Sequence, residues 1–313
     1  MLAENRRSVL TLLLPSLILT GCGGGGVGSL LDRSTPHEQY ARALDRAGLA
    51  DTALAREWLM AAGRALSLPT DAKLPLTTTV NHQAADPRAY GYRLQLQRGR
   101  VLRVELSVEG SAPAIVFIDL FAAREDGRPP ERIASADRNA KTLEHEIERD
   151  GTFILRIQPE LLRGGDLKIG QRTTAALTFP VSGRTSAAVK GFFLDPRDNH
   201  TRDHHGIDIF APRNTPVLAA AGGVVSHVGT NRLGGNVVWV WNPERRQSHY
   251  YAHLERPAVT AGQRVEAGDT VGYVGNTGNA STTLPHLHFG IYHRGEGPID
   301  PLPFVDGARD AAN

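Results

Sequence analysis

The sequence predicts a mainly β protein with a short N-terminal helical pair, a β-sandwich middle domain and a C-terminal compact β-sheet or barrel-sandwich domain. Three observations carry this prediction. Apolar residues recur at helical spacing between residues 36 and 70, and they alternate with polar residues over much of 75–180. Over 181–305, short runs of β-favouring residues are separated by glycine and by turn-forming residues. The length of 313 residues is enough for about two compact domains.

Residues 1–22 have the pattern of a signal peptide. Arg6 and Arg7 precede an apolar run from Val9 to Leu19, which is too short to span a bilayer. The run ends in Leu19-Thr20-Gly21-Cys22, which resembles the bacterial lipobox, where the signal is cut before a cysteine whose thiol carries a lipid. An ordinary signal peptide with a chance cysteine is the alternative.

The residues after Cys22 bear on where the chain resides. Residues 23–35 begin with Gly23–Gly26 and form a flexible glycine-rich tether. Glycine after the cysteine resembles the lipoproteins that are sorted to the outer membrane, so we expect a lipid on Cys22 to anchor the chain to the periplasmic face of that membrane. We expect no later transmembrane helix, because no later segment is apolar enough.

The predicted helical segment covers residues 36–70. Gly48 separates two candidate helices, and Asp51 is the expected N-cap of the second. We interpret the pair as packing or spacer rather than as a functional site. The apolar residues at helical spacing are Tyr40, Leu44, Leu54, Trp58 and Leu66.

The predicted β-sandwich covers residues 75–180. Tyr92–Leu96 and Leu102–Val108 alternate on either side of Arg98-Gly99, which predicts a hairpin with one buried face. Further strands are expected at Ile115–Phe121, Phe153–Ile157 and Ala176–Phe179. The stretch from Asp150 to Arg156 looks like the β-domains called pre-peptidase modules, which leaves wall or glycan binding open beside a spacer role.

Charge and cysteine content exclude several classes of function. The formal net charge is +2 and the basic residues are scattered, so we expect no nucleic-acid partner. The single cysteine, Cys22, excludes an intramolecular disulfide and a thiolate metal cluster, so any metal must be bound by histidine and carboxylate. Nine of the 12 histidines fall within 181–305, so we expect the metal ligands in this segment.

Three short segments of 181–305 alternate polar candidate ligands with apolar residues. On a strand, residues two apart share a face, so His204 and Asp208 are expected to point together, as are His286 and His288. The same rule sets His253 opposite its two apolar neighbours. The segments are His204-His205-Gly206-Ile207-Asp208-Ile209, Tyr251-Ala252-His253-Leu254 and His286-Leu287-His288-Phe289-Gly290-Ile291.

In this order the segments resemble the motifs of the lysostaphin and LytM type of zinc peptidase, peptidase family M23. The resemblance implies that His204, Asp208 and His288 bind Zn²⁺, while His253 and His286 are catalytic histidines whose roles stay undivided. Such a ligand set leaves one corner of a tetrahedral zinc open, as in catalytic sites. The motifs are Arg202-Asp203-His204-His205-Gly206-Ile207-Asp208, Tyr251-Ala252-His253-Leu254 and Pro285-His286-Leu287-His288-Phe289-Gly290.

The resemblance implies a zinc peptidase domain at 181–305, followed by a tail at 306–313, that hydrolyses peptide cross-links of peptidoglycan. In a Gram-negative envelope it implies a D,D-endopeptidase. Two alternatives remain: a non-catalytic LytM-type regulator that activates cell-wall amidases, or a glycan-binding lipoprotein whose β-sandwich is its main function. Such regulators have usually lost metal ligands, and all five positions are kept here. The scissile bond, latency, oligomeric state and protein partners stay open.

Overall fold

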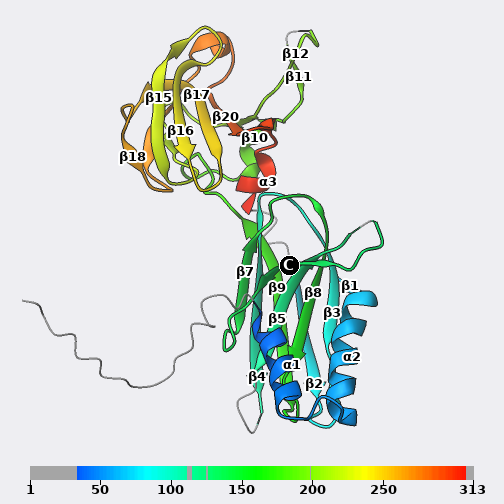
Figure 1. The fold of residues 1–313 in the computed structure, drawn as a ribbon. Helices are drawn as coiled ribbons and strands as arrows, with labels where there is room; N and C mark the ends of the chain where they lie inside the picture. Colours follow the sequence, from blue (N-terminus) through cyan, green and yellow to red (C-terminus); the bar gives the residue numbers. More distant parts are fainter. Residues whose placement is uncertain (1–33, 111–114, 125, 198, 308–313) are drawn as a thin grey trace, which may run out of the picture. The chain divides into compact units, whose positions relative to one another are not determined.

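The computed structural model describes residues 34–110, 115–124, 126–197 and 199–307. In this part of the chain many more residues lie in strands than in helices, which confirms the predicted mainly β fold (Figure 1). The predicted signal peptide, the lipid-attachment residue Cys22 and nearly all of the tether lie outside the described residues. Among the helices that are described, none combines the length and the apolar character needed to cross a membrane.

Side-chain caps set the start of both N-terminal helices. Thr35 and Glu38 form a capping box, in which each side chain accepts a hydrogen bond from the other residue's backbone N–H. The N-cap of the second helix is Thr52. The prediction of Asp51 was wrong by one residue, because both side chains can cap and only the backbone path decides between neighbours. The two helices are α1 (Pro36–Arg46) and α2 (Ala53–Ser67).

Two sheets follow the helices and share one core, so they form the β-sandwich that was predicted. The five-stranded sheet has the order β1-β3-β8-β5-β6, and the four-stranded sheet has the order β2-β9-β4-β7. Leu94 and Leu155 of the first sheet and Leu102 of the second are fully buried between them. The strands are β1 (Thr70–Asp71), β2 (Leu76–His82), β3 (Tyr90–Leu96), β4 (Arg100–Glu109), β5 (Val116–Ala122), β6 (Glu131–Ser135), β7 (Thr142–Glu146), β8 (Gly151–Pro159) and β9 (Gly165–Ala175).

Two details of the predicted sandwich are wrong. β3 and β4 do not form a hairpin, because β3 pairs with β8 while β4 pairs with β7 and β9 in the other sheet. Each strand buries one face in the shared core, so each alternates, and alternation does not identify the neighbouring strand. Ala176–Phe179 is not a strand either: β9 ends at Ala175, and the N–H of Leu177 donates to the Phe304 carbonyl at 2.8 Å.

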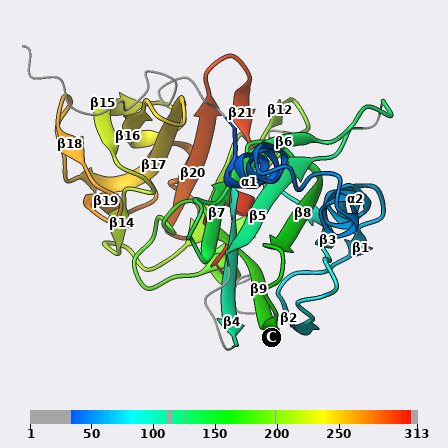
Figure 2. The ribbon, with the colours of Figure 1, turned by 60° about the horizontal axis from the view of Figure 1, so that its bottom comes forward.

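The helical pair packs on the five-stranded sheet, where α2 contacts β3 and β8 (Figure 2). Trp58 of α2 is fully buried, and its indole N–H donates to the Pro159 carbonyl at 2.8 Å. The His37 ring of α1 stacks on Trp58 with ring centroids 4.6 Å apart, and Phe117 of β5 completes the cluster. Aromatic burial of this kind fixes the pair to the sheet.

A ten-stranded sheet forms the C-terminal part of the described chain, with the main path β10-β13-β20-β17-β16-β15-β18 (Figure 1). Residues 216–231 form two strands, because the chain bends between Leu218 and Gly223. The elements are η2 (Ser186–Ala188), β10 (Val189–Gly191), β11 (Pro196–Arg197), β12 (Arg202–Asp203), β13 (Ile207–Phe210), β14 (Pro216–Leu218), β15 (Gly223–Asn231), β16 (Gly235–Asn242), β17 (Gln247–Pro257), β18 (Arg264–Val265), β19 (Thr270–Val274), η3 (Gly278–Ala280), β20 (His286–His293), β21 (Gly297–Ile299) and α3 (Leu302–Val305).

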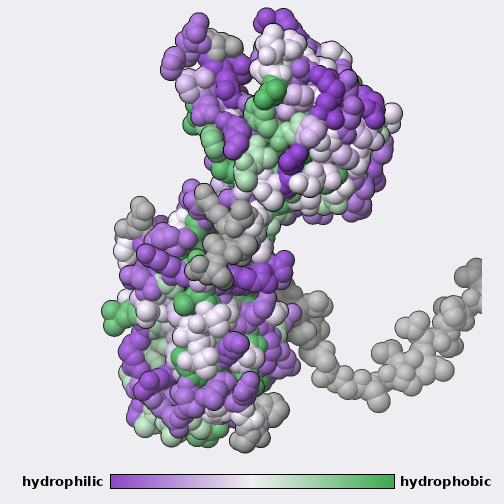
Figure 3. Space-filling view, turned by 180° about the vertical axis from the view of Figure 1, so that it is seen from behind, coloured by the Kyte–Doolittle hydropathy of each residue, from purple (hydrophilic) through white to green (hydrophobic). Residues whose placement is uncertain are grey.

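The two faces of β20 differ in character. Leu287, Phe289 and Ile291 are fully buried in the C-terminal core. His286 and His288 alternate with them and therefore lie on the opposite face of the sheet. On the surface seen in Figure 3, hydrophilic residues predominate and hydrophobic ones form small separate patches, in keeping with apolar side chains gathered in the cores.

Candidate metal centre

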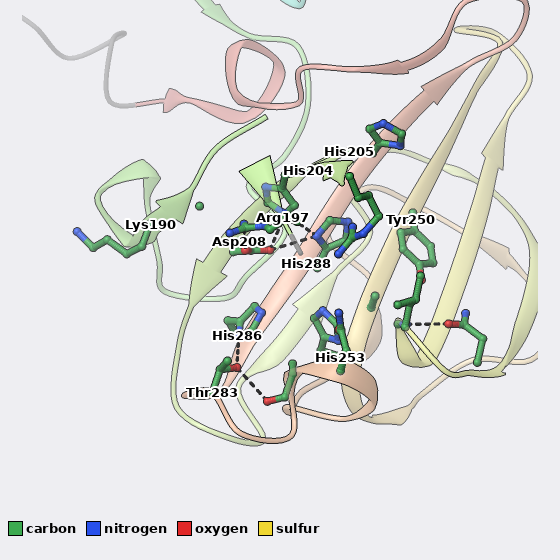
Figure 4. A pocket seen from close by; sticks show the side chains of 18 of the residues that line it. Lys190, Arg197, His204, His205, Asp208, Tyr250, His253, Thr283, His286 and His288 are labelled. Atoms are coloured by element: carbon green, nitrogen blue, oxygen red, sulfur yellow. Dashed lines mark hydrogen bonds and ion pairs between the residues drawn. The ribbon is translucent and has the colours of Figure 1, made fainter. Parts of the chain in front are cut away.

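His204, Asp208 and His288 bring three potential ligand atoms together. Asp208 of β13 and His288 of β20 are direct neighbours across the paired strands. The Nε2 atom of His204 lies 2.9 Å from His288 Nδ1 and 3.0 Å from Asp208 Oδ1, and the last two atoms are 3.1 Å apart. Figure 4 shows the three side chains pointing toward one another.

The alternation of side chains along a strand explains only part of this convergence. His286 and His288 do share a face of β20, but β13 begins at Ile207, so His204 precedes the strand. A loop places it instead. The His204 N–H donates to the Asp195 carbonyl at 3.0 Å, and the His204 carbonyl accepts from the Leu194 N–H at 2.9 Å.

The donor set fits a small divalent cation. Ligand atoms on a tetrahedral zinc, at bond lengths of about 2.0–2.2 Å, lie roughly 3.3 Å from one another. The three atoms here are within 3.1 Å of one another, so slight expansion would seat the ion. Gly206 makes the space for this arrangement, because a Cβ atom there would lie 2.8 Å from His288 Cε1 and 2.5 Å from the Phe289 carbonyl oxygen.

Hydrogen bonds prepare the ligands for a cation. The Nδ1 atom of His204 lies 2.7 Å from the Phe192 carbonyl, which can only accept, so Nδ1 carries the proton and the neutral ring presents a bare Nε2. Burial lowers the pKa of His288 and favours its neutral form.

His253 and His286 lie beside the cluster, on one side of it (Figure 4). Their ring centroids are 5.0 Å apart, and the His253 centroid is 5.9 Å from that of His288. Each Nδ1–H donates to a backbone carbonyl, from His253 to Thr277 at 2.9 Å and from His286 to Leu284 at 2.8 Å. Both neutral rings therefore keep a bare Nε2. Burial, followed by His286 and His288, lowers the pKa of His253 to about 4.

A strained backbone aims His253 at the cavity. Its φ is 61°, in the left-handed region that non-glycine residues rarely adopt, and the pairing of β16 with β17 shifts register between Asn236 and Val238. The expected strict alternation was therefore wrong at this position, since Ala252 and His253 both line the same cavity. Strain of this kind persists only where the surroundings impose it, and it gathers at functional sites.

All five residues open into one cavity of about 600 Å³. Trp239, Tyr250 and Tyr292 form part of its wall, on the same face of the sheet as His288. His205 is exposed and also lines the cavity. The site thus has room for a peptide and combines a ligand cluster with two proton-accepting histidines.

Comparison with known proteins identifies the family. A model described as "Peptidase family M23" matches residues 202–301. The chain is 37% identical over 138 residues to the L-Ala–D-Glu endopeptidase of Bacillus subtilis (strain 168), covering 41% of this chain and 42% of that protein. It is 39% identical over 99 residues to the peptidoglycan DD-endopeptidase ShyC of Vibrio cholerae, covering 31% of this chain and 22% of that protein.

A solved structure completes the comparison. LytU is 35% identical, with 39% of this chain and 90% of that chain covered and a TM-score of 0.36. Residues 202–301 form a domain of peptidase family M23. The chain spans less than half the length of the two curated relatives that it matches.

All five candidate residues lie in the matched segment 202–301. The sequence did not predict two residues that hold them in place. Arg197, whose guanidinium donates to Asp208 Oδ2 at 2.7 Å, precedes the matched residues and carried no recognisable signal. Thr277 falls in a Gly-Asn-Thr-Gly stretch, and nothing in that stretch indicated that its carbonyl would hold His253.

Proposed function

We propose that the M23 domain is a zinc endopeptidase that hydrolyses peptide cross-links of peptidoglycan. One observation carries the proposal: a ligand triangle of His204, Asp208 and His288 shares a cavity with the bare Nε2 atoms of His253 and His286. A zinc ion held by the triangle would supply a Lewis acid for the peptide carbonyl and would lower the pKa of water toward about 7. The name of the Vibrio cholerae relative, a peptidoglycan DD-endopeptidase, favours peptidoglycan as the substrate.

The two remaining histidines would move the protons. A neutral ring whose Nδ1–H is already bonded to a carbonyl can take the proton of the attacking water only at Nε2. The same Nε2–H can then donate to the amine that leaves. The Thr277 and Leu284 carbonyls stabilise each ring in the protonated state, because each continues to accept from Nδ1–H. These bonds also hold the rings in place, so little reorganisation accompanies the reaction.

The test is a digest of purified sacculi by the chain that starts at Gly23, loaded with Zn²⁺ and compared with His204→Ala. Mass spectrometry of the released muropeptides reports both activity and the bond that is cut. We expect the variant to lose at least about 100-fold in rate, as removal of a ligand predicts. His227→Ala is the matched control, because His227 is exposed on β15 and does not line the cavity. Identical profiles for wild type and His204→Ala would refute the proposal.

The same preparation separates the enzyme from a non-catalytic regulator. If the protein is a regulator, wild type and Asp208→Ala will raise the activity of a wall amidase to the same extent. Neither protein will release muropeptides when the amidase is absent. An enzyme that cuts the D-alanyl cross-link of a diaminopimelate-type wall would convert cross-linked dimers into monomers. We favour this D,D-specificity for a Gram-negative envelope, with the lipid on Cys22 anchoring the chain to the periplasmic face of the outer membrane.

A further inference from the structure

The loop from Gly191 to Arg197, here named the support loop, wraps the outer side of the ligand cluster. Its Phe192 carbonyl fixes the tautomer of His204, and its Leu194 and Asp195 backbone groups hold the His204 backbone. The loop is also closed on itself, since the Phe192 N–H donates to Asp195 Oδ2 at 2.6 Å. Phe192 and Leu194 are 47% and 55% exposed, so apolar packing contributes little to its position. The position of the support loop is therefore set by its hydrogen bonds to the candidate ligands and within the loop itself.

Arg197 ends the support loop at the second oxygen of Asp208. Asp208 Oδ1 faces His204 and His288 at 3.0 and 3.1 Å, while Oδ2 accepts from Arg197 Nη2 at 2.7 Å. The side chains of Arg197 and Asp208 are 31% and 14% exposed, so the pair is partly shielded from water. A charge-assisted bond of this length both orients a carboxylate and occupies one of its oxygens.

Gly191 shows that the fold makes room for this pair. A Cβ atom at position 191 would lie 2.5 Å from Asp208 Oδ2 and 2.7 Å from Arg197 Nη2. Any other residue there would push the guanidinium and the carboxylate apart. Asp208 and Gly191 are register partners in the pairing of β10 with β13, so the close approach is set by the sheet itself.

We propose that Arg197 is a positioning residue that holds Asp208 as a one-oxygen ligand and thereby sets the affinity and coordination number of the metal centre. This inference rests on the proposed zinc site. With Oδ2 bound to Arg197, only Oδ1 faces His204 and His288, so a zinc ion held there would take a single oxygen of this carboxylate. Without Arg197 the carboxylate rotates, and both oxygens compete for the ion. Partners of this outer kind typically change metal affinity by about 10–100-fold.

The direction in which the zinc Kd changes distinguishes two roles of Arg197, orienting Asp208 or repelling the ion through its charge. A cation beside a Zn²⁺ site repels the ion, so removing the Arg197 charge should tighten zinc binding if Coulomb repulsion were its main contribution. If Arg197 orients Asp208, the same substitution weakens zinc binding. The two explanations therefore predict opposite changes in the zinc Kd.

The experiment measures the zinc Kd of the chain that starts at Gly23 by chelator competition, for wild type, Arg197→Gln and Arg197→Lys. We expect Arg197→Gln to bind about 10–100-fold more weakly, with Arg197→Lys in between, because an ammonium keeps the charge but lacks the planar fork. Arg213→Gln is the matched control, since Arg213 pairs with Glu255 and does not line the cavity. We expect it to bind zinc as wild type does.

Visible absorption of the Co²⁺-substituted protein provides a second readout that is independent of activity. Four-coordinate Co²⁺ absorbs more strongly than five-coordinate Co²⁺, so a carboxylate that binds through both oxygens should weaken the band in Arg197→Gln. An unchanged or tighter zinc Kd in both Arg197 variants, with an unchanged Co²⁺ band, would overturn the inference alone. Absence of zinc binding by wild type would overturn the proposed function as well. Melting of the metal-free variants near the wild-type temperature shows that they are folded.

Discussion

Protonation of His37 should weaken the docking of the helical pair on the sandwich. His37 is 6% exposed, stacks on Trp58, and lies with its Nε2 atom 2.7 Å from Gln158 Oε1. The Gln158 amide nitrogen donates to the Trp58 carbonyl at 2.9 Å, so Oε1 is the atom that faces His37 and accepts from its Nε2–H. Acid must therefore place the second proton on Nδ1 of an enclosed ring.

The magnitude follows from the shift in pKa. Burial, with Arg156 adding to it, lowers the pKa of His37 from 6.5 to about 4, against the smaller opposing effects of Gln158, Asp119 and Glu38. The unfolded chain then binds the proton more tightly than the folded chain. The contribution of neutral His37 to the free energy of unfolding is fully present above pH 6.5. It falls as the pH drops toward 4, by up to 1.36 kcal/mol per pH unit and by about 3 kcal/mol in total at pH 4.

The assay is urea unfolding at pH 7.5, 5.5 and 4.0, followed through the transition that exposes Trp58, for wild type and His37→Gln. Glutamine can still donate to Gln158 but does not titrate, and carboxylate titration is common to both proteins. The unfolding free energy of wild type minus that of His37→Gln should therefore fall by about 3 kcal/mol between pH 7.5 and pH 4.0. A difference that stays constant within about 0.5 kcal/mol over this range would refute the reasoning.

Three further predictions test the packing around the site and in the helices. Gly206→Ala should weaken zinc binding by at least about tenfold in chelator competition, because its Cβ would lie 2.5 Å from the Phe289 carbonyl oxygen; an unchanged Kd would contradict this. Tyr251→Phe should cost about 1–3 kcal/mol in urea unfolding, because the buried hydroxyl accepts from the Ala220 N–H at 2.8 Å; a loss below about 0.5 kcal/mol would be too small. Gly63→Ala should stabilise α2 by about 0.5–1 kcal/mol, since its Cβ meets nothing within 4 Å, and a lower melting temperature would disprove it.

The sequence by itself determined the mainly β fold and the face of β20 on which two candidate site residues lie. Period-two alternation placed His286 and His288 on one face of β20, because a strand that buries one face must turn every second residue outward. Because Cys22 is the single cysteine of the sequence, histidine and carboxylate side chains were left as the metal ligands. The mainly β fold followed from the same local preferences, which need no knowledge of partners.

Only the tertiary structure decided which elements meet. β3 and β4 carry the alternation of a hairpin but lie in opposite sheets, since the pattern reports a buried face and not the strand beside it. His204 precedes its strand and His253 bends out of its own, so neither follows the alternation that was used to predict them. Arg197 meets Asp208 through a loop whose hydrogen bonds have no periodic signature. Contacts of this kind depend on the path of the whole chain, which no local pattern encodes.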